Sequence, residues 1–139
     1  MSVLDEIVAS KKRELVETIR MCPLDELLEG ASLRSPVSFT SALTQQGINI
    51  IAEIKYKSPS HGSFKCQLPA PQIAKLYSDN GAVAVSVLTE QSYFAGDLSF
   101  LDEIDRELPQ LPLLRKDFIV DHYQVAETRR SPASAYLLI

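Results

Sequence analysis

Four short apolar segments recur along the sequence at intervals that suit a repeated strand–helix unit. We expect strands near residues 50–55, 83–88, 111–116 and 135–139. Helical patterns fill the intervals between them, near residues 70–80, 98–108 and 121–130. Strands that are apolar on both faces and alternate with helices are typical of a parallel sheet covered by helices. The spacing therefore predicts the α/β class.

The residues before the first expected strand form a helical extension in this interpretation. Three helices are expected there: residues 2–20 with Ser2 as the N-cap, Pro23–Leu28 ended by Gly30, and residues 35–43. We therefore divide the chain into an extension, residues 1–47, and a strand–helix part, residues 48–139.

The first strand carries charges that an apolar strand rarely has. Glu53 and Lys55 are two residues apart, so their side chains share one face of the sheet. This arrangement fits either an edge strand with a hydrated face or a functional site, because an unpaired buried charge is costly. A doubly wound sheet and a (β/α)8 barrel both remain possible for the fold. No GxGxxG follows the first strand, whereas Glu53, Lys55 and Lys116 all lie near the carboxyl ends of strands, where barrels place their catalytic residues.

Composition excludes several other classes of function. The 139 residues are 45% hydrophobic and 23% charged with a net charge of −4, which argues against a nucleic-acid-binding surface. The apolar runs are too short for a membrane-spanning helix, and the amino terminus resembles no signal or transit peptide. Two cysteines without CxxC spacing and two histidines make no metal site, and no GxSxG is present. We expect a cytoplasmic protein without a bound metal.

Three motifs in order carry a resemblance to a known family. The segments IIAEIKYKSPSHG, AVSVLTEQSYFAGDLSFL and PLLRKDFIVDHYQVAETR resemble the amino-terminal half of indole-3-glycerol phosphate synthase. The first residues, VLDEIVASKKRELVE, resemble the extra helix before the barrel of that family. The resemblance implies a (β/α)8 barrel, here about its first four strand–helix units. It also implies a decarboxylating lyase of tryptophan biosynthesis. That enzyme closes the indole ring of 1-(2-carboxyphenylamino)-1-deoxyribulose 5-phosphate with loss of carbon dioxide and water, without a cofactor.

The resemblance assigns catalytic roles to the three strand-end charges. Ring closure needs a proton donor at the substrate ketone, and a lysine can serve if its surroundings bring its pKa toward the working pH. Lys116 matches that general acid. Lys55 matches a lysine near the substrate carboxylate and phosphate that takes part in later proton transfer. Glu53 matches a carboxylate that contacts the anilino nitrogen and holds the lysines. The alternative is that both lysines are ordinary strand-end residues that extend into solvent.

The resemblance also assigns a substrate-binding set. Ser58 matches a serine of the loop that lines the substrate site, and Phe94, Phe118 and Leu137 match apolar residues that pack on the anthranilate ring. Taken singly, Phe94 and Phe118 fit a core position as well.

Other polar residues are interpreted as structural. Arg115 is expected between strand and helix, and Tyr93 and Asp117 are interpreted in the same way. His61 is assigned to a hydrated loop. The run Lys11, Lys12 and Arg13 is interpreted as a solvated helix face.

The sequence departs from the family in two respects. A barrel takes about 250 residues, so the second catalytic glutamate of the family and its phosphate-binding loops have no counterpart here. Before the last strand, Pro132 stands where the family has a glycine and Ser134 where it has an acid, so we expect the turn there to be rebuilt.

Two hypotheses of different class follow from these departures. The chain is either the amino-terminal part of a synthase or a non-catalytic half-barrel that self-associates. Under the first hypothesis, pairing with a carboxyl-terminal half would complete the barrel. The expected ligand is a phosphorylated small molecule. Another phosphosugar-binding barrel, such as phosphoribosylanthranilate isomerase, is a further alternative, but the E-x-K and RKDF motifs do not suit it.

Overall fold

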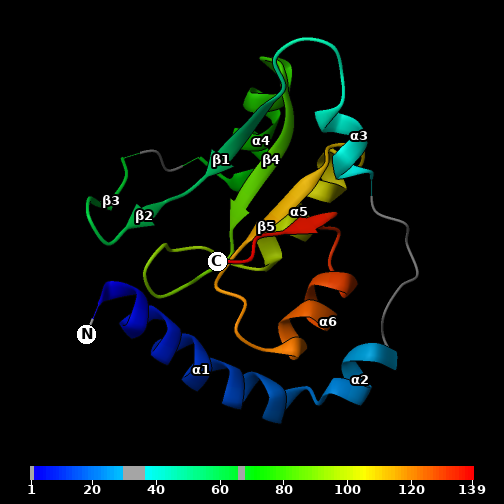
Figure 1. The fold of residues 1–139 in the computed structure, drawn as a ribbon. Helices are drawn as coiled ribbons and strands as arrows, with labels where there is room; N and C mark the ends of the chain where they lie inside the picture. Colours follow the sequence, from blue (N-terminus) through cyan, green and yellow to red (C-terminus); the bar gives the residue numbers. More distant parts are fainter. Residues whose placement is uncertain (1, 30–36, 66–67) are drawn as a thin grey trace.

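The sheet at the centre of the chain is parallel and follows the order of the sequence. A computed structural model describes residues 2–29, 37–65 and 68–139. Its main sheet has the order β1-β4-β5-β6, with all neighbours parallel (Figure 1). The strands are β1 (Ile50–Ile54), β4 (Ala82–Leu88), β5 (Leu113–Lys116) and β6 (Ala135–Tyr136). This order confirms the four expected strands and shows no reversal of the kind that a doubly wound sheet has at its switch point.

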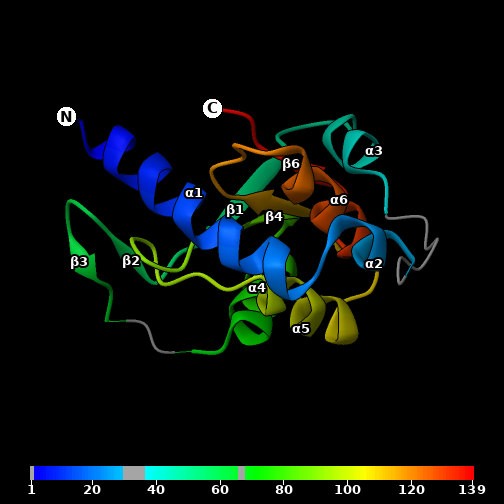
Figure 2. The same cartoon turned by 90° about the horizontal axis from the view of Figure 1, so that it is seen from below.

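Three helices connect the strands and cover one face of the sheet. They are α4 (Ala70–Asp79), α5 (Ser99–Glu107) and α6 (His122–Arg130), close to the expected ranges. Figure 2 shows α4 and α5 together on the same side of the sheet. The core between the layers joins buried strand residues to buried helix residues, among them Ile54, Val85, Val87, Leu113, Ile73, Ala74, Leu101 and Ile104. Helices on one face with strands in sequential order give a half barrel, as expected.

The other face of the sheet is the one that a barrel turns inward. Glu53 is paired in register with Ser86, and Leu88 with Lys116. Paired residues of neighbouring parallel strands share a face, and successive residues alternate. The alternation therefore puts Glu53 and Lys116 on the face opposite the helices, together with Lys55.

The amino-terminal extension runs past the carboxyl ends of the strands. It contains α1 (Val3–Met21), α2 (Leu24–Glu29) and α3 (Phe39–Leu43). Ser2 is the N-cap of α1, as expected, and forms a capping box with Asp5. In Figures 1 and 2, α1 crosses the end of the sheet at which β4 and β5 finish. Gly30 and residues 35 and 36, which were expected at helix ends, lie outside the described residues.

Apolar packing fixes the carboxyl-terminal part of α1 to α6. Leu15, Leu27 and Tyr123 form a buried cluster, and the Tyr123 hydroxyl donates to the Cys22 carbonyl oxygen over 2.8 Å. The extension thus shares a core with the strand–helix part. The division at residue 47 stays a prediction.

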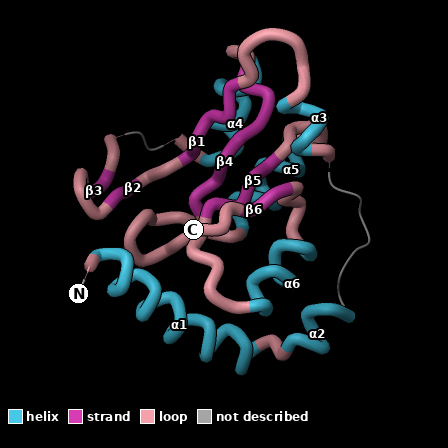
Figure 3. Tube along the Cα trace, in the orientation of Figure 1, coloured by secondary structure: helices cyan, strands magenta, loops and turns pink. Residues whose placement is uncertain are grey.

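Two expectations about strands were wrong in detail. The last strand ends at Tyr136 and not at Ile139, because its outer side has no partner among the described residues. The SPSHG stretch, interpreted as loop, contains a short antiparallel hairpin of β2 (Lys57–Ser58) and β3 (Gly62–Ser63), visible in Figure 3.

The turn before β6, which lies wholly within the described residues, has no left-handed residue. Ser131 ends α6 in an extended conformation, with φ −78° and ψ 166°, and Pro132 takes the next position, where a left-handed glycine is common. Its hydroxyl donates to the Thr128 carbonyl and accepts from the Ala133 N–H. The Ser134 N–H then donates to Leu113 O over 2.9 Å, which starts the pairing of β6 with β5.

Candidate active site

Glu53, Lys55 and Lys116 form a cluster on the inward face of the sheet. Lys55 Nζ lies 2.9 Å from Glu53 Oε1, and Lys116 Nζ lies 3.4 Å from Glu53 Oε2. The three side chains are each about one-third exposed. β1 lies at the edge of the sheet, as the edge-strand interpretation expected. Its Glu53 is nevertheless paired both with Lys55 and with Lys116 at the end of β5. The carboxylate of Glu53 bridges two ammonium groups that a ligand can still reach.

The electrostatics of this cluster favour an ionised Glu53. Burial raises the pKa of Glu53, but the hydrogen bond from Lys55 and the charges of Lys116 and Lys55 outweigh it, so the pKa lies below its ordinary value. A carboxylate that stays ionised accepts hydrogen bonds and orients the two lysines. It does not act as a proton donor near neutral pH.

A pocket of about 690 Å³ opens beside Lys55 and brings together four of the seven expected site residues. Lys55, Ser58, Phe94 and Phe118 line it, and the rings of Phe94 and Phe118 are 6.1 Å apart between centroids. Its other lining residues come from α1 and from the hairpin: Val3, Leu4, Ile7, Pro59, Ser60, His61 and Phe64. An apolar lining with a few polar groups suits a ligand with an aromatic ring and anionic substituents.

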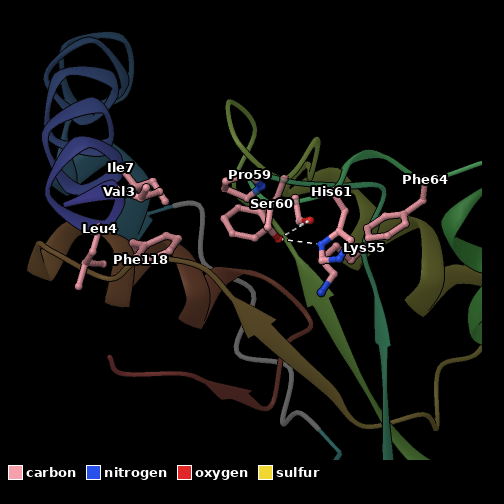
Figure 4. Close-up of a pocket in the computed structure, with 11 residues that line it drawn as sticks. Val3, Leu4, Ile7, Lys55, Pro59, Ser60, His61, Phe64 and Phe118 are labelled. Atoms are coloured by element: carbon pink, nitrogen blue, oxygen red, sulfur yellow. Dashed lines mark hydrogen bonds between the residues drawn. The ribbon is translucent and has the colours of Figure 1, made fainter.

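Figure 4 shows how two parts of the chain form opposite walls of this pocket. Val3, Leu4 and Ile7 project from α1, whereas Lys55, His61 and Phe64 lie on the side of β1 and the hairpin. Sequence reasoning missed the α1 wall. The available signal was that Val3 and Leu4 extend the apolar stripe of α1 beyond Ile7. In the structure they stay exposed, at 54% and 46%, because they face the pocket.

Glu53, Lys116 and Leu137 are not among the pocket-lining residues. Glu53 and Lys116 adjoin the pocket through Lys55. The Leu137 N–H donates to Arg115 O over 3.2 Å, continuing the β5–β6 ladder, so Leu137 stands level with Lys116 on the inward face. A contact between Leu137 and a ligand stays a prediction.

Glu90 is a site-forming residue that sequence reasoning missed. It is fully buried, and its carboxylate accepts the backbone N–H groups of Ser92, Tyr93 and Phe94 over 3.1, 2.7 and 3.0 Å. These bonds fold the loop after β4 so that Phe94 reaches the pocket. Gly96 closes the loop against the Leu88 carbonyl, where a Cβ would overlap the backbone. The signal was an acid placed two residues after an apolar strand.

His61 lies in an exposed part of the loop, as expected, and also lines the pocket. Its Nδ1 is 2.7 Å from Ser60 Oγ, which in turn lies 3.5 Å from Ser58 Oγ (dashed lines in Figure 4). The hairpin thus presents a row of small polar groups next to Lys55.

Behind the site lies a buried ionic network that includes Arg115 and Asp117, two of the residues interpreted as structural. Arg115 is 3% exposed and contacts Asp117 over 3.2 Å and Glu127 over 2.7 Å, which confirms its expected place between β5 and α6. Lys12 and Arg13 are exposed as expected. Lys11 corrects the interpretation of its run: it is 7% exposed, with its Nζ 3.4 Å from Asp117 Oδ1.

Residues 2–29, 37–65 and 68–139 contain neither a metal-ligand cluster nor a helix that could span a membrane. No group of three or more His, Cys, Asp or Glu side chains there is arranged to hold a metal ion. Within the same ranges, no helix has the length and apolar character needed to cross a bilayer.

The fold and the site together define the class of the protein. Strand–helix units in sequential order, with charged side chains at the carboxyl ends of parallel strands, are the features of (β/α)8-barrel enzymes. Residues 4–139 match the family described as indole-3-glycerol phosphate synthase, and the chain belongs to this family.

Curated relatives bear the same name. The protein of Thermoanaerobacter sp. (strain X514) is 43% identical over 137 residues, an alignment that covers 99% of this chain and 52% of the relative. That of Salinibacter ruber is 43% identical, covering 100% of this chain and 52% of the relative. That of Leptospira interrogans is 44% identical, covering 99% and 51%. The chain spans about half the length of the curated relatives it matches.

Proposed function

We propose that this chain supplies the amino-terminal half of an active site that forms indole-3-glycerol phosphate. The substrate is 1-(2-carboxyphenylamino)-1-deoxyribulose 5-phosphate, which loses carbon dioxide and water. The observation that carries the proposal is the bridge from Glu53 to Lys55 and Lys116 beside an apolar pocket. A biosynthetic reaction on a phosphorylated sugar fits the cytoplasm, which we propose as its compartment.

In this proposal Lys116 is the proton donor. The aromatic carbon that carries the carboxylate attacks the ketone carbon, and the ketone oxygen takes a proton from the Lys116 ammonium group. Carbon dioxide then leaves from the attacking ring carbon, which restores the aromatic ring. The methylene carbon beside the nitrogen loses a proton to form the indole double bond, and the new hydroxyl departs as water after a second proton transfer to its oxygen. Lys55 is the candidate for that transfer, because Glu53 holds it on the same face of the sheet, with Lys55 Nζ 2.9 Å from Glu53 Oε1.

The pocket supplies binding in the same proposal. Phe94 and Phe118 pack on the aromatic ring, while Lys55 attracts the anionic groups. Ser58, which is buried at the pocket wall, offers a hydroxyl to a polar substituent.

A reconstituted barrel tests this function. We expect turnover when residues 1–139 are joined in frame to the carboxyl-terminal half of the Thermoanaerobacter sp. relative, because the later strands supply the remaining site residues. Product is followed by indole fluorescence, and the 139-residue chain alone serves as the comparison. A folded chimera that binds the substrate but releases no product would contradict the proposal.

We also propose that the open edges of the sheet pair with another half-barrel. β1 and β6 are edge strands, and Ile50, Ile51 and Ile139 beside them are exposed. Unpaired edges with exposed apolar residues favour association. A second copy related by a twofold axis along the barrel would place β1 beside the partner's β6 in parallel and close an eight-stranded ring.

Sedimentation of the 139-residue chain tests the pairing. We expect a dimer at micromolar concentrations. Ile51→Lys should shift the equilibrium toward monomer, because it places a lysine charge at the edge strand that pairs with the second copy. Leu76→Lys, which changes a leucine on α4 that is 52% exposed against 41% for Ile51, should leave the dimer intact. A chain that stays monomeric at all concentrations would rule out self-pairing and leave a carboxyl-terminal half as the only partner of this kind.

A further inference from the structure

A buried ion pair joins α1 to the strand that carries Lys116. Lys11 and Asp117 are 7% and 3% exposed, and Lys11 Nζ lies 3.4 Å from Asp117 Oδ1. Glu14 adds a second carboxylate 3.1 Å from the same ammonium group. Burial lowers the pKa of Lys11, but the charges of Asp117, Glu14 and Glu90 together raise it above its ordinary value. Lys11 is therefore held charged inside the protein by its partners.

Asp117 occupies the junction of several elements. Its Oδ1 accepts the backbone N–H of Phe118 over 2.8 Å, and its Oδ2 accepts the Thr89 hydroxyl over 2.7 Å. Arg115 also donates to Oδ2 over 3.2 Å. One carboxylate thus ties the end of β4, the end of β5 and the turn that presents Phe118, so its position is set by the barrel and not by α1.

Lys11 stands at the boundary between two differently held parts of α1. On its carboxyl-terminal side, Leu15 packs in the buried cluster with Leu27 and Tyr123. On its amino-terminal side, Val3 and Leu4 line the pocket but are about half exposed, and Ile7 is the single buried residue of the first two turns. The Glu14 carboxylate also accepts the Ser92 hydroxyl over 2.8 Å, one helical turn after Lys11.

We propose that Lys11 and Asp117 are positioning residues that fix the first two turns of α1 as a wall of the pocket. The pair holds this wall in register with Phe118, and Asp117 directly follows Lys116, the last residue of β5. The pocket wall and the proposed proton donor are therefore anchored by consecutive residues at the end of one strand. The inference about ligand binding rests on the proposed function, whereas the inference about α1 does not.

Hydrogen exchange of the 139-residue chain, followed by mass spectrometry, tests the position of α1 without a ligand. In Lys11→Met we expect amides of residues 6–10 to exchange about tenfold faster or more, because local opening there loses its anchor. Amides of β4 and β5 should keep their protection, since Asp117 still has Arg115 and Thr89. Lys11→Arg keeps the charge and should restore most of the protection. Lys12→Met, one residue away and exposed, should match the parent chain.

Binding of an unreactive substrate analogue, in which the ketone is reduced to an alcohol, gives a second readout by calorimetry. We expect Lys11→Met to weaken binding about tenfold, because the wall must be ordered again when the ligand binds. The calorimetry uses the reconstituted barrel. Failure of the barrel with unchanged Lys11 to bind the analogue would count against the proposed function alone, since hydrogen exchange still decides the role of the pair.

Two exchange results would overturn the proposal. One is unchanged protection of residues 6–10 in Lys11→Met. The other is an equal loss of protection in α1, β4 and β5, which a purely structural role produces. Asp117→Asn provides a second variant, because its amide oxygen can keep one barrel contact while the charge that holds Lys11 is lost. Because this variant also removes the charge that faces Arg115, we expect the loss of protection in α1 to exceed that in β4 and β5. An equal loss in all three elements would overturn the proposal.

Discussion

Lys116→Met in the reconstituted barrel is expected to lower kcat for ring closure by about 10²- to 10⁴-fold, the range that a positioned proton donor contributes. KM should change little, because a proton is transferred only as the transition state forms, and interactions confined to the transition state appear in kcat. Glu53 would keep Lys55 as a partner at 2.9 Å, so the fold of the strand ends should survive the change. Product release is followed by indole fluorescence under steady-state conditions.

Lys75→Met is the matched control for this measurement. Lys75 is also a lysine paired with a carboxylate, Asp79, at 2.9 Å, but it lies on the outer surface of α4. Its replacement should leave kcat and KM unchanged. A Lys116→Met enzyme with normal kcat and raised KM would mean that Lys116 binds the substrate instead of donating the proton, and the donor would then have to be sought at Lys55.

The parts of the fold that could be predicted from the sequence are those with a strong local signal. The apolar runs at β1 and β4 indicate strands by themselves, although only β4 is largely buried, and the Ser2–Asp5 capping box marks the start of α1 within four residues. The pairing of Glu53 with Lys55 also follows from strand alternation alone. The bridge to Lys116 runs from β1 past β4 to β5, so it depends on the order of the strands, which the resemblance to a barrel supplied.

The residues that were missed or misinterpreted depend on contacts distant in sequence. Glu90 caps a loop that no periodic pattern predicts, and the hairpin of β2 and β3 is too short for one. Lys11 is a different case, because its signal was present. It stands four residues after Ile7 and four before Leu15, both buried, so helical periodicity puts it on the apolar stripe. Interpreting it together with Lys12 and Arg13 as one face overlooked that consecutive helical residues point in different directions.

Arg115→Met is expected to have the largest effect on stability of any single substitution considered. The buried guanidinium donates to Glu127 over 2.7 Å, to Asp117 over 3.2 Å and to the Thr128 hydroxyl over 2.9 Å. Methionine fills part of the volume but leaves the Glu127 carboxylate without this partner in a partly buried place. Breaking a buried ion pair from one side costs about 3–5 kcal/mol, a large share of the roughly 5–15 kcal/mol by which a domain is stable.

Urea denaturation followed by circular dichroism, at one fixed protein concentration, measures this loss in the free energy of unfolding. Arg106→Met is the control, because Arg106 is exposed on α5, and it should change the free energy by less than about 0.5 kcal/mol. Arg115→Lys separates charge from geometry: a lysine keeps the charge but cannot reach Glu127, Asp117 and the α6 backbone with a planar fork, so an intermediate loss is expected. If the free energy of unfolding of Arg115→Met lay within about 1 kcal/mol of that of the parent chain, the network would behave as a hydrated surface pair. The support for Asp117, and through Asp117 for the wall formed by α1, would then have to come from Thr89 and the Phe118 amide.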